Sequence, residues 1–219
     1  MKRDLTFFFS VALFLGMLPG CGRIIDFGKS SVEQGEEIEN DVEVARDYIR
    51  SSRTYDIFTL VGAFDSLWLA DEVREMYTDL YALKYGKTEQ EKKIFLRRQF
   101  EENIHFISFY LLSVADIPIG DKDSAWAIYL RLGDNNFVPV EFKKVELNPE
   151  FKLIFGKKFT RFKTAYLLRF NAKDIEDVSL INPGVDTVKL VFRTIEKEVI
   201  HEWNIDGKAQ LKREDVSVV

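Results

Sequence analysis

Strand-like segments dominate the chain from residue 106 to residue 205, and they limit its possible folds more than any other feature. Residues 126–132 alternate in side-chain character with a period of two, which is typical of a strand with one buried face. Turn-forming residues such as Gly133-Asp134-Asn135-Asn136 separate neighbouring segments. The segments with strand character are 106–114, 126–132, 137–147, 164–172, 187–195 and 199–205. We expect an antiparallel β domain over residues 104–207, folded as a β-sandwich of immunoglobulin-like size, with an open sheet packed on helices as the alternative.

Helical patterns precede these segments. Apolar residues recur at helical spacing after Asp71, and Gly86 is a natural end for that helix. Thr88-Glu89-Gln90-Glu91 then has the form of a capping box, which begins a second helix. Together these signals predict a helical hairpin over residues 70–103.

The residues before the hairpin carry mixed signals. The apolar spacing from Val42 predicts a short helix that ends near Ser51-Ser52. Residues 54–64 are rich in β-branched and aromatic side chains, which are typical of a strand. We expect residues 42–103 to be mainly helical, and the fold class to be α+β with N-terminal helices followed by the β-sandwich.

The N-terminus has the pattern of an export signal. Lys2 and Arg3 precede an almost wholly apolar run over residues 5–18. As a helix, 14 residues would span about 21 Å, which is shorter than the roughly 30 Å hydrocarbon core of a bilayer. The run therefore predicts a secretory signal rather than a transmembrane helix.

Leu18-Pro19-Gly20-Cys21 follows the apolar run and resembles the lipobox of bacterial lipoproteins, in which a leucine and two small residues precede a cysteine. The resemblance implies that residues 1–20 are a cleaved signal peptide. It also implies that Cys21 carries diacylglycerol through a thioether, becomes the new N-terminus and is N-acylated. A cysteine suits this reaction because a thiolate is the competent nucleophile for taking up the lipid.

The resemblance also bears on location. Residues 21–41 would then be a lipidated tether, and their acidic, weakly apolar composition is typical of a solvated segment. In related lipoproteins an Asp after the cysteine retains the protein at the inner membrane, whereas Gly22 stands here. We expect an exported, lipid-anchored protein, at the outer membrane if the organism has one, with a charged, frayed tail at 208–219.

Composition excludes several functional classes. A single cysteine rules out an internal disulfide and a thiolate zinc site, since both need at least two. A net charge of −5 argues against nucleic acid as a partner, because phosphate contacts need a basic excess. His105 and His201 each stand alone in predicted strands, where histidines are more often packed or exposed than catalytic. We expect no metal site and no cofactor, and no catalytic residue can be named.

One segment is strongly basic, although the chain as a whole has a negative net charge. Residues 151–173 contain seven basic residues and no acidic one, interleaved with aromatic residues. We hypothesise that this segment faces an anionic partner, such as lipid headgroups, a cell-wall polymer or an acidic protein. The alternative is a β-hairpin with its aromatics in the core and its lysines in solvent. The candidate patch residues are Lys152, Lys157, Lys158, Arg161, Lys163 and Arg169.

These features favour a membrane-anchored lipoprotein that acts as a non-catalytic interaction or scaffolding module in the cell envelope. Its partners would be the lipid bilayer, through acylated Cys21, and an envelope protein or an anionic polymer. An envelope hydrolase that uses paired carboxylates is one alternative, since 35 acidic residues remain after residues 1–20 are removed. A periplasmic carrier of an apolar ligand is another.

Overall fold

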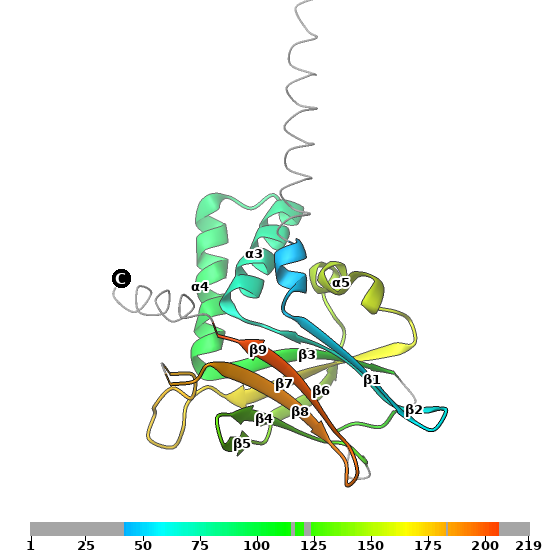
Figure 1. The fold of residues 1–219 in the computed structure, drawn as a ribbon. Helices are drawn as coiled ribbons and strands as arrows, with labels where there is room; N and C mark the ends of the chain where they lie inside the picture. Colours follow the sequence, from blue (N-terminus) through cyan, green and yellow to red (C-terminus); the bar gives the residue numbers. More distant parts are fainter. Residues whose placement is uncertain (1–41, 115–116, 121–123, 183, 206–219) are drawn as a thin grey trace, which may run out of the picture. The chain divides into compact units, whose positions relative to one another are not determined.

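The computed structural model describes residues 42–114, 117–120, 124–182 and 184–205. These residues form two antiparallel sheets together with helices, so the α+β class expected from the sequence is confirmed (Figure 1). The first sheet has the order β1-β2-β3-β7-β6, with β1 Ile49–Asp56, β2 Thr59–Trp68, β3 Phe106–Val114, β7 Lys163–Asn171 and β6 Glu141–Val145. The second has the order β5-β4-β8-β9, with β5 Asn135–Phe137, β4 Ala127–Leu132, β8 Thr187–Arg193 and β9 Glu198–Asn204.

The predicted helical hairpin is confirmed. Helix α3 (Asp71–Tyr85) ends at Gly86, whose φ of 58° is the left-handed conformation that favours glycine. Helix α4 (Glu89–His105) begins with the predicted capping box, in which the Thr88 hydroxyl accepts from the Glu91 N–H and the Glu91 carboxylate accepts from the Thr88 N–H. The local signals were sufficient here because α3 ends at a glycine in the left-handed conformation and α4 begins at two side chains only three residues apart.

Residues of both sheets share one apolar core. Phe64 of β2 stacks on Phe192 of β8 with ring centroids 4.3 Å apart, and Phe109 of β3 lies 5.3 Å from Trp203 of β9. All four are buried. Because this core is built from aromatic and aliphatic side chains, the described domain holds together without any thiol chemistry.

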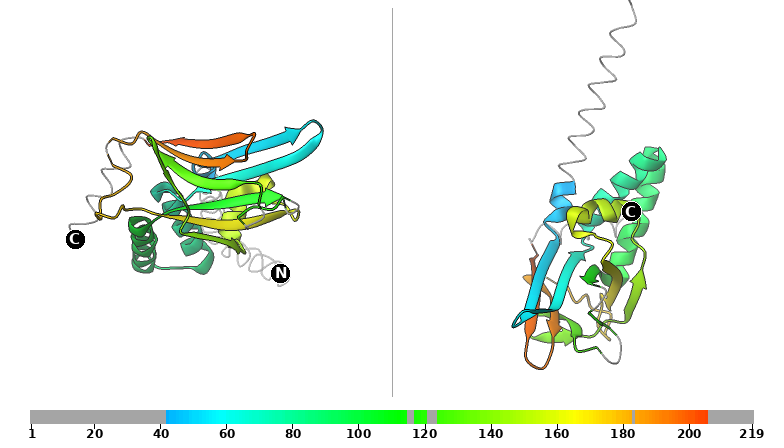
Figure 2. Two further views of the ribbon diagram at one scale, coloured as in Figure 1. Left: turned by 90° about the horizontal axis from the view of Figure 1, so that it is seen from below. Right: turned by 90° about the vertical axis from the view of Figure 1, so that its right-hand side faces the viewer.

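The helices cover the other face of the first sheet. Successive strand residues point to opposite faces, so Tyr110 points away from the core that Phe109 enters. Tyr110 packs on Phe151 of α5 (Pro149–Phe155), and Phe151 stacks on Tyr77 of α3 with centroids 4.4 Å apart. Figure 2 shows this order, with β8 and β9 on one side of β3 and β7 and the helices on the other.

Residues 42–103, predicted to be mainly helical, contribute two long strands. The helix over residues 42–46 stops well before Ser51-Ser52, and β1 begins at Ile49. Ile49, the last apolar residue of the spacing that predicted a longer helix, is instead the first residue of β1, where its side chain is buried. The single strand predicted at 54–64 is instead a tight hairpin between β1 and β2, since Asp56 pairs with Thr59.

The structure also differs from the sequence prediction near the middle of the chain. Pro149 begins α5, because proline at the first helical position needs no hydrogen-bond donor. Residues 156–158 continue as a 3-10 turn, η1 (Gly156–Lys158), so the first part of the basic segment is helical rather than a β-hairpin. The strand predicted at 137–147 is divided into β5 and β6, with Pro139 between them.

Among the described residues, no helix combines the length and apolar character that crossing a membrane requires. Cys21, the predicted signal and tether at 1–41, and the tail at 208–219 lie outside the described residues.

Candidate functional site

The fold divides the basic segment between the interior and the surface. Lys163 forms an ion pair with Asp65, and Arg169 forms ion pairs with Glu102 and Glu141. Lys152 lies 3.6 Å from a carboxylate oxygen of an exposed glutamate, Glu146. The charges of these three patch residues are therefore used within the domain.

Asp65 explains why Lys163 points inward. Asp65 lies in β2 and is fully buried, and its carboxylate is also 3.2 Å from the guanidinium of Arg53. Burial acts to raise the pKa of Asp65, but a hydrogen bond and charge from Lys163, a hydrogen bond from Ser51 and the charge of Arg53 outweigh it. The net pKa is lowered. A buried carboxylate with two cations is a structural ion-pair cluster, and it stays ionised at neutral pH.

The remaining basic residues lie on the surface. Lys157 and Lys158 occupy η1, and Arg161 follows in the turn that leads to β7. The Lys158 ammonium donates to the hydroxyl of Ser51 at 2.8 Å, and the Arg161 guanidinium lies 4.7 Å from the ring centre of Phe162. All three residues are exposed, and none forms an ion pair with a carboxylate within the described part of the chain, so their charges face solvent.

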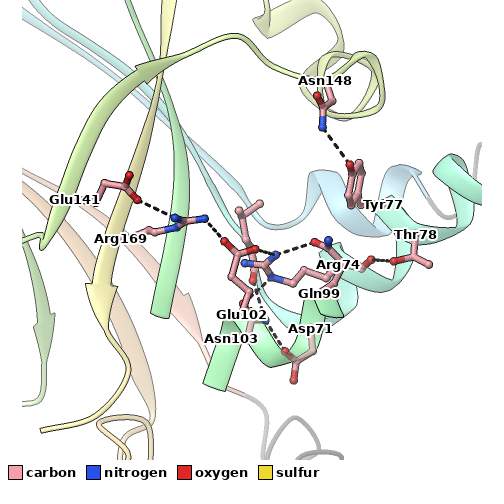
Figure 3. A network of polar contacts seen from close by, with 11 residues as sticks. Asp71, Arg74, Tyr77, Thr78, Gln99, Glu102, Asn103, Glu141, Asn148 and Arg169 are labelled. Atoms are coloured by element: carbon pink, nitrogen blue, oxygen red, sulfur yellow. Dashed lines mark hydrogen bonds and ion pairs between the residues drawn. The ribbon is translucent and has the colours of Figure 1, made fainter. Parts of the chain in front are cut away.

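Arg169 belongs to a partly buried polar network that joins the helices to the first sheet (Figure 3). Its guanidinium contacts Glu102 of α4 and donates to Glu141 of β6 at 2.8 Å. Glu102 also accepts from Arg74 of α3 at 2.8 Å, and Arg74 donates to Asn103 at 2.6 Å. The network therefore ties α3, α4, β6 and β7 together with charge-assisted hydrogen bonds.

Asn103 extends this network to the start of α3. Its amide donates to the backbone oxygen of Leu69 at 3.1 Å and to the carboxylate of Asp71 at 2.6 Å. Burial lowers the pKa of Arg74, while the charge and hydrogen bond of Glu102 act to raise it. These hydrogen bonds and ion pairs make the network a clamp between the two helices and the first sheet.

His201 lies where β9 meets β1 and β2. Its Nδ1 is 2.9 Å from the hydroxyl of Ser66 in β2, and its Nε2 is 2.9 Å from the hydroxyl of Ser52 in β1. Burial lowers the pKa of His201 to about 4, and the charges of Arg50 and Arg53 act in the same direction against that of Asp65. The imidazole is neutral at neutral pH, and it bridges the two sheets as a packed residue.

Other side chains connect the edges of β1 and β9 in the same way. Arg50 Nε donates to the backbone oxygen of Glu202 at 2.7 Å, and Trp203 Nε1 donates to the backbone oxygen of Tyr48 at 2.8 Å. Strands β1 and β9 are not paired, and these side chains therefore supply hydrogen-bond donors to backbone oxygens at the two strand edges.

Two hairpin turns carry the most exposed large apolar side chains of the strand ends. In the β1–β2 turn, Ile57 is 85% exposed and Phe58 is 95% exposed, and Ile195 in the β8–β9 turn is fully exposed. Lys197 joins the two turns, because its ammonium donates to the backbone oxygen of Tyr55 at 2.8 Å. We call Tyr55, Ile57, Phe58 and Ile195 the apolar tip.

The conformation of Ile57 is unfavourable for its residue type. Its φ is 54°, a left-handed conformation that a β-branched residue rarely adopts. A two-residue hairpin turn with positive φ at its first position favours glycine. Strain of this kind costs on the order of 1 to 3 kcal/mol and is concentrated at functional positions.

A groove between α3 and α4 has a volume of about 210 Å³. Tyr81 and Phe95 line it and stack with centroids 4.4 Å apart, while Lys87 is paired with Glu91 at 3.1 Å. Lys92, at its edge, is paired with Asp79 on α3. The lysines thus already have acidic partners in the helical hairpin.

The four carboxylates whose pKa is clearly shifted give no specific support to a hydrolase. The pKa of Asp65, Glu91, Glu141 and Glu198 is lowered in each case, whereas a general acid needs a raised pKa. Glu91 has the lowest, about 2, because it accepts hydrogen bonds from Thr88 and Lys87. No group of three or more metal-ligating side chains gathers among the described residues.

The basic segment was identified from the sequence, but the apolar tip was not. Ile57-Phe58 carries no glycine, proline or asparagine, so nothing in it signals a turn. His105, predicted in a strand, is instead the last residue of α4. His201 does lie in a strand, as a packed residue.

The chain matches no protein-family model, no curated protein and no solved structure in the comparisons made with it. Function must therefore be inferred from its own residues.

Proposed function

We propose that this chain is an exported lipoprotein, anchored through an acylated Cys21 and acting as a non-catalytic interaction module in the cell envelope. The resemblance of Leu18-Pro19-Gly20-Cys21 to a lipobox supports the anchor. Two or more acyl chains on the mature N-terminus hold a protein stably on a bilayer, whereas one does not. The outer membrane is the proposed location if the organism has one.

The proposed module is the α+β domain, with its two sheets packed as a sandwich of immunoglobulin-like size. The observation that supports interaction rather than catalysis is the apolar tip. Phe58 and Ile195 bury almost none of their surface within the domain, and Ile57, next to Phe58, is held in a strained turn. Lys197 links the two turns, and exposed apolar side chains on neighbouring turns mark a site of contact with other molecules.

The apolar tip lies at the far end of β1 from the helical turn at 42–46. Strand β1 runs from Ile49, just after residues 42–46, to the tip at Asp56, and eight strand residues span about 25 Å. Figure 1 shows the same separation, with the helical turn at 42–46 at one end of β1 and the β1–β2 turn at the other. The proposed partner of the apolar tip is an envelope protein, because an anionic polymer would gain little from aliphatic and aromatic side chains.

Acylation is tested by feeding cells an alkyne-tagged fatty acid and comparing wild type with Cys21→Ser. We expect label and detergent-phase partitioning in the wild type only. A Cys21→Ser protein that is still labelled would contradict the anchor, whatever the tip does.

The apolar tip is tested by placing a photo-crosslinking residue at position 58, at position 195, or at the control position 138 in intact envelopes. Val138 is a matched control because it is also an exposed apolar residue, 77% exposed, but outside the tip. We expect the same crosslinked protein from positions 58 and 195 and not from 138. Crosslinking of equal yield and identity from all three positions would refute the tip as a docking site.

A further inference from the structure

A second exposed surface lies next to Val42, the first described residue. It combines Arg46 from the helical turn at 42–46 with residues that follow α5. We call Arg46, Lys157, Lys158, Arg161 and Phe162 the basic face.

The contact between Arg46 and α5 joins distant parts of the chain. Arg46 Nε donates to the backbone oxygen of Ile154, 108 residues away, at 3.4 Å. Gly156 lies against the Arg46 guanidinium, since a side-chain carbon at this position would be in van der Waals contact with it at 3.5 Å. Figure 1 and the right-hand view of Figure 2 show α5 beside the turn at 42–46.

The charges of the basic face are not neutralised by ion pairs in the described structure. Arg46 donates to a backbone oxygen, Lys158 donates to the neutral hydroxyl of Ser51, and Arg161 lies over the ring of Phe162. Glu43 and Asp47 lie on the same helical turn as Arg46 and reduce the net charge of the region. Four cations against two acids still leave it positive, in a chain whose total is −5.

Apolar side chains stand among these cations. Phe162 is 63% exposed, and Leu153 on α5 is 49% exposed. Cations that bind phosphate, next to an aromatic ring that enters the acyl boundary, are the two components of an interfacial membrane contact. An anionic polymer would use the cations but would leave Phe162 in water.

We propose that the basic face is a membrane-contact surface that binds the anionic headgroups of the bilayer to which the chain is tethered. This deepens the proposed function and rests on the anchor, because a 21-residue segment from Cys21 to Asp41 spans at most about 75 Å and keeps the domain near that bilayer. A weak surface then suffices, since the tether raises its effective concentration at the membrane. A lipid chain plus a basic patch is a known two-component mode of stable anchoring.

The contact also sets an orientation. With the basic face on the bilayer, the end of β1 that carries the apolar tip is directed away from the bilayer, toward a partner.

The test uses a chain that begins at Gly22 and carries no lipid, so that its outcome does not depend on acylation. Residues 42–205 contain the continuous core described above, which this chain retains. Binding is measured by co-sedimentation with vesicles of phosphatidylcholine containing about 30% phosphatidylglycerol, and with vesicles of phosphatidylcholine alone. We expect binding to the anionic vesicles only, and release as the salt concentration rises.

Lys157→Gln with Arg161→Gln removes two charges that make no ion pair within the domain, so the fold is expected to be unchanged. Each basic residue at an anionic surface contributes roughly a fivefold gain in partitioning, so the double variant should bind at least about tenfold more weakly. The matched control is Lys93→Gln with Arg98→Gln, two exposed cations on α4, which should change binding less than about twofold. Phe162→Ser should also weaken binding but leave its salt dependence unchanged.

Equal binding of the wild type and the Lys157/Arg161 variant would overturn the proposal, as would equal binding to charged and neutral vesicles. Loss of binding in the α4 control to the same extent would show a general charge effect and would also overturn it. Failure of acylation at Cys21 is measured separately and would leave these vesicle results intact.

Discussion

Changing His201 to glutamine removes a titratable group from the contact between β9 and the first sheet. Glutamine can still hydrogen-bond to Ser52 or Ser66, but it cannot take up a proton. It also loses the ring contact with Phe192, whose centroid lies 5.2 Å from that of the imidazole. At neutral pH we expect the variant to be less stable than the wild type by about 1 to 2 kcal/mol, the usual cost of altering a buried polar contact.

The pH dependence of that difference follows from the pKa of His201. Burial lowers the pKa from 6.5 to about 4, so between these values the unfolded chain binds more protons than the folded protein. The stabilising contribution of the neutral imidazole is therefore complete above about pH 6.5 and is lost as the pH falls toward 4. Each pKa unit corresponds to about 1.4 kcal/mol, so the total loss is roughly 3 kcal/mol.

The assay is denaturant unfolding of both proteins at several pH values between about 4.5 and 7.5. Groups common to both proteins, including Asp65 with its lowered pKa, largely cancel in the difference. We expect the advantage of the wild type to shrink by about 2 to 3 kcal/mol over this range and to vanish or reverse at its acid end. Parallel stability curves, or an imidazole NMR signal of His201 that titrates near its ordinary pKa, would refute the reasoning.

Two further substitutions test how the domain is held together, by the same unfolding measurement. Lys163→Met removes one of the two cations that pair with buried Asp65 and should cost about 3 kcal/mol at neutral pH, whereas Lys157→Met at the surface should cost less than about 0.5 kcal/mol. Equal losses would contradict the inward role of Lys163. Ile57→Gly should raise stability by about 1 kcal/mol by relieving a positive φ, while Ile57→Ala, which keeps a Cβ, should gain nothing comparable. A gain from alanine as large as that from glycine would show that strain is not the cause.

The helical hairpin and most of the strands could be predicted because their signals are local. The Thr88–Glu91 capping box and the glycine at position 86 act within one turn of their own helix. The strand at 106–114 was predicted with the bounds it has in the structure. Alternation with a period of two requires only that one face be buried, and it does not depend on which strand is the neighbour.

The β1–β2 hairpin and α5 could not be predicted in the same way. The Ile57-Phe58 turn lacks any turn residue, so its existence depends on the pairing of β1 with β2 along their length. Helix α5 is only seven residues long, too short to be stable alone, and it is held by the packing of Phe151 on Tyr77 and Tyr110.

By itself, the sequence determined the export and lipobox pattern, the α+β class, the helical hairpin and the presence of a basic, aromatic segment, because each depends on residues close together in the chain. Only the tertiary structure decided which basic side chains of that segment point into the domain and which stay in solvent. It turned Lys163 toward buried Asp65 and Arg169 into the clamp between helices and sheet. It left Lys157 and Arg161 in solvent and brought Arg46 into contact with α5. The physical reason is that a charge is turned inward where folding brings an opposite charge to it from another element.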